Sequence, residues 1–195
     1  MVPTDIRERL LMAAATLIRE QGLRKLTQPR VAKAAGVSQS HLTYYFPTRA
    51  DLVHAVLERA AERQSAGVEA TVAVADEGVE ALVRELAKTS ARPENTRVLV
   101  SFVLAADTDP TARAMFGGLA GGMRATIAEM LGKVGIAPHP EAVTMVHALG
   151  TGLAILELAL GGSAAQPDTA ATLRQLFDLL AERDVAAAEA LIEPS

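Results

Sequence analysis

Apolar residues recur every three or four positions along most of the chain, which is the pattern of amphipathic α-helices. No stretch shows the apolar–polar alternation of a β-strand bounded by turn residues. The sequence therefore predicts an all-α fold. In the first helical segment the apolar stripe is made of Ile6, Leu10, Ala14, Leu17 and Ile18.

Capping residues mark the ends of the first two helices. Thr4 is the expected N-cap of the first helix, Asp5 suits the positive end of its dipole, and Gly22 suits the left-handed position after its last turn. Thr27 is the expected cap of a second helix over about 28–35. These signals predict two helices separated by a short connection.

A third short helix follows the turn at Gly36-Val37. Ser38 is its expected N-cap, and it continues to Phe46, with Leu42 and Phe46 on one face. A Thr-x-x-Asp capping box then opens a long helix from Arg49 toward about Val72. We expect the first three helices to form one domain over 1–48.

Helical patterns continue to the end of the sequence and predict an all-helical domain over 49–195. Prolines punctuate these patterns at helix starts and loops, and residues 74–77 are the expected loop after the long helix. The remaining helices are predicted over about 77–90, 94–106, 111–133, 140–161 and 168–192.

Charge divides the 195-residue chain unevenly. Residues 1–64 hold ten Lys/Arg and six Asp/Glu, net +4, whereas residues 65–195 hold nine and seventeen, net −8. This predicts that only the first third meets a polyanion, unless the charges are merely solvated surface. The chain has no cysteine, and charged residues occupy the place of a secretory apolar region, so we expect a cytoplasmic protein without disulfides.

Residues 27–46 form two short helices joined by a glycine-containing turn, which is the geometry of a DNA-binding helix-turn-helix. The polar side chains of the second helix suit base edges, whereas hydroxyls and one arginine suit phosphates. The alternative is that the aromatic run at 44–46 is simply core. Three consecutive helical residues span about 200° of arc, so they cannot all face one core. The candidates for bases are Gln39, Ser40, His41 and Tyr44, and those for phosphates are Thr27, Thr43, Tyr45 and Arg49; His41 is alternatively just exposed.

An ordered series of residues extends from helix 1 into the fourth helix: Ala13-Ala14, Gly22, Thr27, Val31-Ala32, Ala35-Gly36-Val37-Ser38, Leu42, Tyr44-Tyr45-Phe46 and Arg49-Ala50-Asp51-Leu52. This series resembles the tetracycline-repressor (TetR) family of bacterial regulators, whereas the rest of the chain matches that family in length and helical character. The resemblance implies a DNA-reading helix at 38–46, with Ser38 included, and a ligand-binding and dimerisation role for the helical domain over 49–195. It also implies phosphate contacts by Thr27 or Gln28, Thr43, Tyr45 and Arg49.

Three positions depart from the family pattern. Thr43 stands where the family usually has a tyrosine that bonds a phosphate; because threonine is shorter, we expect that contact to be lost or to be reached through water. Ser40 stands where glycine is common and adds a side chain facing DNA. Arg49 replaces the usual lysine, which keeps the charge but presents a two-pronged donor.

Four glycines, Gly117, Gly118, Gly121 and Gly122, lie inside the helix predicted over 111–133. They cost about 3–4 kcal/mol of helix stability relative to alanine. Either they line a cavity, or they allow close helix packing, or the helix breaks there. The cavity interpretation, with the ligand pocket that the family implies, gives an apolar effector site with few polar anchors. Its candidates are Phe102, Met115, Phe116, Met123, His147 and Glu157.

Two of these candidates have plain alternatives: His147 as a buried histidine bonded to a carbonyl, and Glu157 as a solvent-facing or dimer-pairing group. Residues 142–162 are long and apolar enough for a membrane span, but Glu157 and the lack of flanking basic residues argue against insertion. We expect a homodimer through helices 140–161 and 168–192, with the stripe of Leu173, Leu176, Phe177 and Leu180 as the partner face of the last helix.

Motifs of common enzyme classes are missing from the sequence, and the four histidines lack metal-ligand spacing. The carboxylate pair of Asp107 and Asp109, before Pro110, is better interpreted as a helix cap than as catalytic carboxylates. A helical carrier without DNA affinity is the second alternative, and the basic first third argues against it. We therefore expect no catalytic residue, cofactor or metal, and a homodimeric repressor released from a palindromic operator by a largely apolar small molecule.

Overall fold

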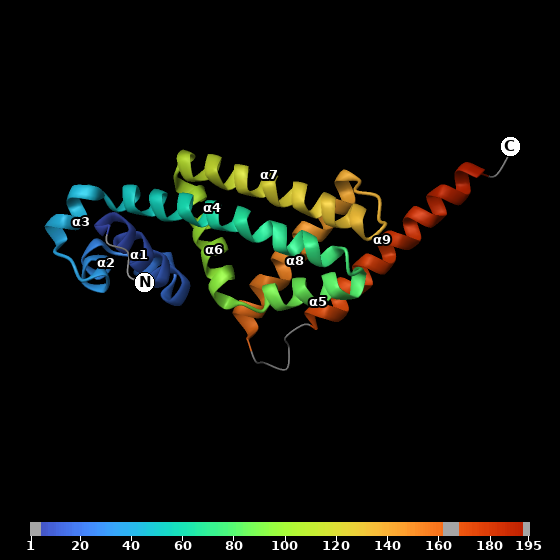
Figure 1. Ribbon diagram of the computed structural model, residues 1–195, viewed down its shortest axis with the longest axis horizontal. Helices are drawn as coiled ribbons and strands as arrows, with labels where there is room; N and C mark the ends of the chain where they lie inside the picture. Colours follow the sequence, from blue (N-terminus) through green and yellow to red (C-terminus); the bar gives the residue numbers. More distant parts are fainter. Residues whose placement is uncertain (1–4, 162–167, 193–195) are drawn as a thin grey trace. The chain divides into compact units, whose positions relative to one another are not determined.

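In the computed structural model, the backbone is described for residues 5–161 and 168–192, and side chains for these residues except 60–71 and 187–192. The regular structure in this part of the chain is helical and contains no strand (Figure 1), which confirms the all-α prediction. The elements are α1 (Ile6–Gln21), η1 (Leu23–Lys25), α2 (Gln28–Ala35), α3 (Gln39–Tyr45), α4 (Arg49–Ala75), α5 (Val79–Ser90), α6 (Pro93–Thr108), α7 (Pro110–Lys133), α8 (Pro140–Leu160) and α9 (Thr169–Ile192).

The helix ends follow the predicted positions with three corrections to the caps, at Thr4, at Gly22 and at Thr27, whose hydroxyl makes no capping bond. The N-cap of α1 is Asp5 and not Thr4, which lies outside the described residues; the Asp5 carboxylate accepts the Arg7 N–H at 3.0 Å. A carboxylate does this better than a hydroxyl because it also stabilises the helix dipole. Gly22 takes a positive φ of 77° after α1, but its ψ of 168° lies outside the left-handed helical region that was predicted. The long helix α4 reaches Ala75, so the expected loop at 74–77 begins two residues later.

The chain divides into two compact units. Unit 1 comprises residues 1–64 and 94–119, and unit 2 comprises residues 65–93 and 120–195. Unit 1 therefore contains the first part of α4, all of α6 after Pro93 and the first part of α7, in addition to the first three helices. The predicted boundary at residue 48 divides the DNA-binding function from the ligand-binding and dimerisation function, and it stays a prediction.

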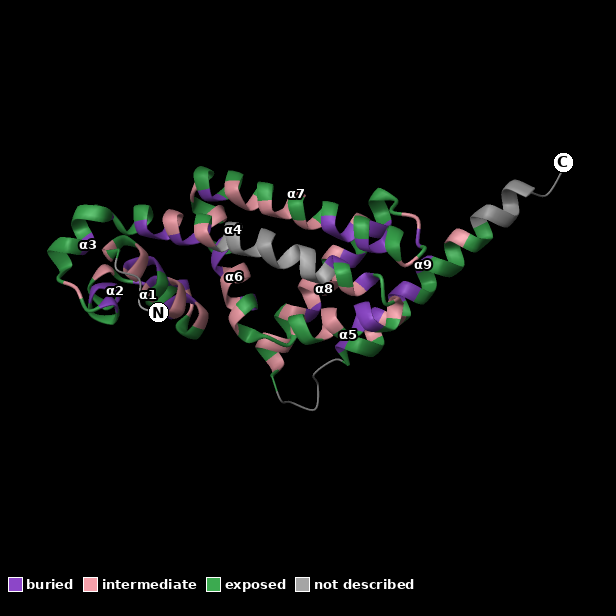
Figure 2. Cartoon of the chain, viewed as in Figure 1, coloured by how far each residue is buried: buried purple, intermediate pink, exposed green. Residues whose placement is uncertain are grey.

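The core of unit 1 is built around the short N-terminal helices. α1 packs against α2 and α3, and Leu10, Val31 and Leu42 are completely buried among them. The buried inner faces of α1 and α2 are visible in Figure 2. Phe102 of α6 and Ala112 of α7 belong to the same buried cluster. The helix-turn-helix is therefore supported by residues more than fifty positions away in the sequence.

Polar contacts also connect α4 and α6 to the rest of unit 1. Arg59 pairs with Glu8, and the Arg97 Nη1 donates to the carbonyl oxygen of Arg19 at 2.9 Å, at the C-terminal end of α1. A cation at this end is favoured by the helix dipole. These contacts hold α1 from two sides, through α4 and through α6.

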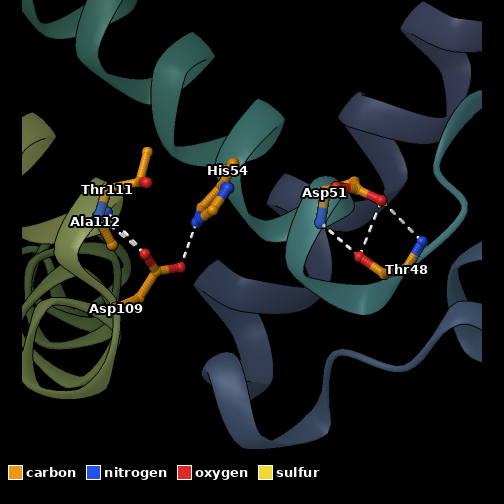
Figure 3. A network of polar contacts seen from close by, with 6 residues as sticks. All are labelled: Thr48, Asp51, His54, Asp109, Thr111 and Ala112. Carbon is orange, nitrogen blue, oxygen red and sulfur yellow. Dashed lines mark hydrogen bonds and ion pairs between the residues drawn. The ribbon is translucent and has the colours of Figure 1, made fainter.

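The carboxylate of Asp109 connects α4 with the start of α7 (Figure 3). One oxygen bonds the His54 Nε2, and the other accepts the N–H groups of Thr111 at 2.8 Å and Ala112 at 3.3 Å. This confirms the interpretation of Asp109 as a helix cap. The bond from His54, followed by the two backbone N–H bonds, lowers the pKa of Asp109 below its usual 3.8, against a smaller opposing effect of desolvation.

Unit 2 has an aliphatic core to which α5, α8 and α9 contribute by packing on one another. Its core also takes the end of α4 and the second part of α7, through Val72 and Leu131. The apolar stripe of α9 is buried here: Leu173, Leu176, Phe177 and Leu180 are 1–7% exposed. The expectation that this stripe faces a partner subunit was wrong, because the four side chains are already used in the core of their own protomer.

The four glycines of α7 do not break the helix, which continues from Pro110 to Lys133. A Cβ atom added at any of them would meet no described atom within 4 Å. Close helix packing through these positions is therefore not found within the described chain. The cavity interpretation stays a prediction.

Candidate DNA-binding surface

The predicted turn between α2 and α3 has the geometry of a glycine-capped helix end. Gly36 takes a left-handed φ of 65°, and the Val37 N–H donates to the Ala32 carbonyl at 3.0 Å. The hydroxyl oxygen of Ser38 then accepts the His41 N–H at 3.2 Å, as expected of the N-cap of α3. Local sequence thus fixes both the end of α2 and the beginning of α3.

The aromatic run at the end of α3 is divided between core and surface. Phe46 is buried with Leu42, whereas Tyr44 is 81% exposed and Tyr45 is 36% exposed. The two tyrosine rings meet edge to face, with centroids 5.2 Å apart. The core interpretation is therefore right for Phe46 and wrong for Tyr44. An exposed tyrosine pair of this kind is costly to leave without a binding role.

The polar residues of α3 are gathered on its outer surface. Gln39, Ser40, Thr43 and Tyr44 surround an open depression, and His41 is exposed beside them. The Thr43 hydroxyl donates to the Gln39 carbonyl at 2.9 Å within the helix. This surface offers an amide, hydroxyls and a phenol, which are groups that hydrogen-bond base edges in the major groove.

The candidate phosphate-binding residues differ in how far their side chains are already used. Thr27 is exposed at the N-cap position of α2, where its hydroxyl makes no capping bond. Gln28 donates instead to the Phe46 carbonyl at 2.8 Å. Arg49 donates to the carbonyls of Leu26 and Leu23 at 2.9 and 3.0 Å. Phosphate contacts by these residues stay predictions.

The capping box at the start of α4 forms in both directions (Figure 3). The Asp51 carboxylate accepts the Thr48 N–H and hydroxyl, each at 2.8 Å, and the Thr48 hydroxyl oxygen accepts the Asp51 N–H at 3.1 Å. The hydroxyl bond, followed by the backbone bond, lowers the pKa of Asp51. This confirms the sequence motif and fixes the direction in which the chain leaves α3.

Two arginines of α1 contact residues of the helix-turn-helix, and neither was identified from the sequence. The Arg9 Nη2 donates to the Ala35 carbonyl at 2.6 Å, at the C-terminal end of α2. The guanidinium carbon of Arg7 lies 5.8 Å from the ring centre of Phe46. Neither contact has a local sequence signal, because the partners are 26 or more positions apart.

The six candidate ligand residues are distributed over both units. Phe102 is buried in the core of unit 1, with Met115 and Phe116 packed partly buried against that core. Met123 packs against the core of unit 2, and the Glu157 carboxylate accepts the Thr169 hydroxyl at 2.7 Å. Burial, and secondarily Arg124, lowers the pKa of His147 below 6.5. The assignment of these residues to a ligand stays a prediction.

Family models match almost the whole chain. The model described as bacterial regulatory proteins of the tetR family matches residues 10–56, and a tetracyclin repressor-like C-terminal domain matches residues 73–183. The chain therefore belongs to the TetR family of transcriptional regulators. This places a DNA-binding fold in the first helices and a family-specific helical domain after it.

Individual relatives are more distant. Nucleoid occlusion factor SlmA of Haemophilus ducreyi (strain 35000HP / ATCC 700724) is 30% identical over 114 residues, which are 53% of this chain and 55% of that protein, so the match spans about half of each. A transcriptional regulator (RHA1_ro04179) from Rhodococcus sp. Rha1 has a TM-score of 0.71 at 21% identity, covering 90% of this chain and 96% of that one. A regulator from Saccharomonospora viridis, solved with choline, has a TM-score of 0.69 at 20% identity, covering 90% and 95%. These two solved structures have the same fold as this chain.

Proposed function

We propose that this TetR-family protein is a cytoplasmic homodimeric repressor that binds a palindromic operator and releases it when a small molecule binds. The observation that carries the proposal is the division of α3, in which Leu42 and Phe46 are buried while the polar residues and Tyr44 face solvent. A helix of this kind enters the major groove of DNA. An enzyme or a carrier would have no need of such a surface.

Within α3, we assign base contacts to Gln39, Ser40, His41 and Tyr44. Ser38 lies at the N-terminus of the helix, where backbone N–H groups and the dipole favour a phosphate. Hydroxyls of Thr27, Thr43 and Tyr45 supply further backbone contacts. For Thr43 this requires the hydroxyl to leave its present bond to the Gln39 carbonyl and to donate to a phosphate oxygen instead.

The dimer interface is proposed on α8 and α9. α8 is the one described helix long and apolar enough to cross a membrane, yet only 17% of its apolar window is buried within the chain. Because the Leu173–Leu180 stripe of α9 is already buried, other side chains must form the interface. Exposed aliphatic residues are available on both helices: Met145, Ile155, Leu156, Leu179 and Val185.

The effector is proposed to be apolar or cationic. Met123, His147 and Glu157 of unit 2 are the lining residues, and no Lys or Arg occurs between Lys133 and Arg174. The α8 wall of such a site offers an anion no basic partner, whereas the carboxylate of Glu157 suits a cation. The Saccharomonospora neighbour of the same fold holds choline, which is a cation of this class.

The effector proposal is tested with Gly121→Leu. A Cβ atom added at this glycine meets no described atom within 4 Å, so the leucine side chain would occupy space that the proposed effector uses. We expect loss of operator release by choline or a longer-chain quaternary ammonium ion, with DNA binding unchanged. Gly121→Ala is the matched control, since it adds only one carbon. Normal release by folded, dimeric Gly121→Leu would place the site elsewhere.

DNA binding itself is tested by a gel shift against the gene's own upstream DNA, followed by a salt titration. A dimer that neutralises roughly six to ten phosphates should lose about a thousandfold or more in affinity between roughly 50 and 200 mM salt. Failure to retain any palindromic site, or a flat titration, would contradict the proposal. A carrier would give neither the shift nor the salt dependence.

A further inference from the structure

Arg49 occupies a position where a positive charge is not favoured by its own helix. It is the first residue of α4, and the N-terminal end of a helix carries a partial positive charge. Its guanidinium turns away from the α4 axis, with Nε donating to the Leu26 carbonyl and Nη2 to the Leu23 carbonyl. Both acceptors belong to the segment that joins α1 to α2.

Gln28 makes the reverse contact across the same junction. It is the first residue of α2, and its Nε2 donates to the Phe46 carbonyl at 2.8 Å and, more weakly, to the Pro47 carbonyl at 3.4 Å. Arg49, at the start of α4, thus bonds the segment before α2. Gln28, at the start of α2, bonds the segment after α3. The two contacts together close the outer ends of the helix-turn-helix.

We propose that Arg49 and Gln28 form a two-sided clamp that positions α3, and that this role, rather than contact with a phosphate, accounts for their effect on DNA binding. The inference rests on the proposed function only in naming DNA as the ligand. Two of the five guanidinium N–H donors of Arg49, and the side-chain amide of Gln28, already bond backbone carbonyls. Two parallel donors on a planar guanidinium fit two fixed carbonyls, whereas the ammonium of a lysine does not reproduce that geometry.

The two roles give opposite results for Arg49→Lys, which keeps the charge and loses the fork. A clamp predicts that Arg49→Lys and Arg49→Ala both weaken binding about tenfold, because a charge-assisted pair of bonds is lost in each. The slope of affinity against salt concentration should stay as in wild type. A phosphate contact predicts near-normal binding for Arg49→Lys and, for Arg49→Ala, a slope lower by about one per subunit.

Gln28→Leu removes the other half of the clamp without changing any charge. We expect a similar loss of affinity with an unchanged salt slope, and less than the summed loss when Gln28→Leu and Arg49→Lys are combined. Arg24→Lys is the matched control, because Arg24 is an exposed arginine of η1 in the same unit. It should leave affinity and slope unaltered.

Affinities are measured on a duplex that wild-type protein selects from a random pool, with far-ultraviolet circular dichroism to verify folding. Amide hydrogen exchange on the free protein supplies a reading without DNA. The clamp predicts about tenfold faster exchange over residues 39–46 in Arg49→Lys and in Gln28→Leu, with no change in Arg24→Lys.

Weaker DNA binding with an unchanged salt slope, together with faster exchange, in both Arg49→Lys and Gln28→Leu supports the clamp. Near-normal affinity of Arg49→Lys, or unchanged exchange in both variants, overturns it. If wild type selects no duplex at all, the proposed function fails, and the exchange data alone decide whether the clamp exists.

Discussion

The interactions that stabilise the interior of unit 1 differ from those that stabilise the interior of unit 2. In unit 1, side chains from distant positions bond backbone carbonyls at helix ends: Arg9 at Ala35, Gln28 at Phe46, Arg49 at Leu26 and Arg97 at Arg19. Unit 2 has an aliphatic core to which its long helices contribute, and several large aliphatic side chains of α8 and α9 remain exposed outside it.

This difference follows from what each unit has to do in the proposed function. A DNA-reading helix of only seven residues buries little apolar surface, so directed polar bonds must fix its orientation. Helices of more than twenty residues have surface left over after their own core is filled. Packing against a second copy is the economical way to cover it.

The largest expected effect is on assembly. Leu179, 55% exposed on α9, should become buried in the dimer, so Leu179→Glu places a charge in the interface and weakens dimerisation by on the order of a hundredfold. Sedimentation across a concentration series measures this. Val103→Glu, at an exposed aliphatic position of unit 1, is the matched control and should leave the mass unchanged. Equal behaviour of the two variants would remove the proposed contrast between the units.

The next effect concerns recognition of individual bases. Gln39→Ala and Tyr44→Ala should each relax the preference at particular base pairs by roughly 1–3 kcal/mol, because each removes hydrogen bonds to a base edge. Competition with duplexes substituted one base pair at a time gives this value. A uniform loss over all sequences, with a lower salt slope, would show that these residues contact phosphates.

The glycines of α7 allow the two units to be compared within one helix, since Gly118 belongs to unit 1 and Gly121 to unit 2. Alanine meets no described atom at either position, so each substitution should raise the free energy of unfolding by about 0.5–1 kcal/mol. Chemical denaturation measures it. Destabilisation by alanine at one position only would identify the glycine that a partner or a ligand approaches closely.

The smallest effect is a pH dependence from His147 in unit 2. Burial, with a smaller contribution from Arg124, lowers the pKa of His147 in the folded protein below 6.5. Between that lowered pKa and 6.5 the unfolded chain binds the proton and the folded chain does not, so stability present above 6.5 is lost as the pH falls.

The melting temperature of His147→Gln should therefore fall less than that of wild type when the pH is lowered through 6.5. Differential scanning fluorimetry at a series of pH values tests this. The matched control is His139→Gln, at an exposed histidine, which should follow wild type. If His147→Gln and wild type lose stability in parallel, burial of the imidazole has no measurable cost.

Most of unit 1's local structure was predictable from the sequence, because its signals act over a few residues. Ser38 caps α3, Thr48 and Asp51 close the capping box, and Gly36 takes the left-handed turn that a Cβ would strain. The periodic placement of Leu42 and Phe46 likewise predicted which face of α3 is buried.

Only the tertiary structure decided which partner is bonded by a side chain that has more than one possible partner. An arginine at position 49 fits a phosphate or two carbonyls equally well by composition, and the chain path places Leu23 and Leu26 within its reach. The stripe from Leu173 to Leu180 predicted burial correctly, but whether its partner lies in the same protomer or in another depends on how α5 and α8 pack. Periodicity specifies that a face is covered, and only the packing of distant segments specifies what covers it.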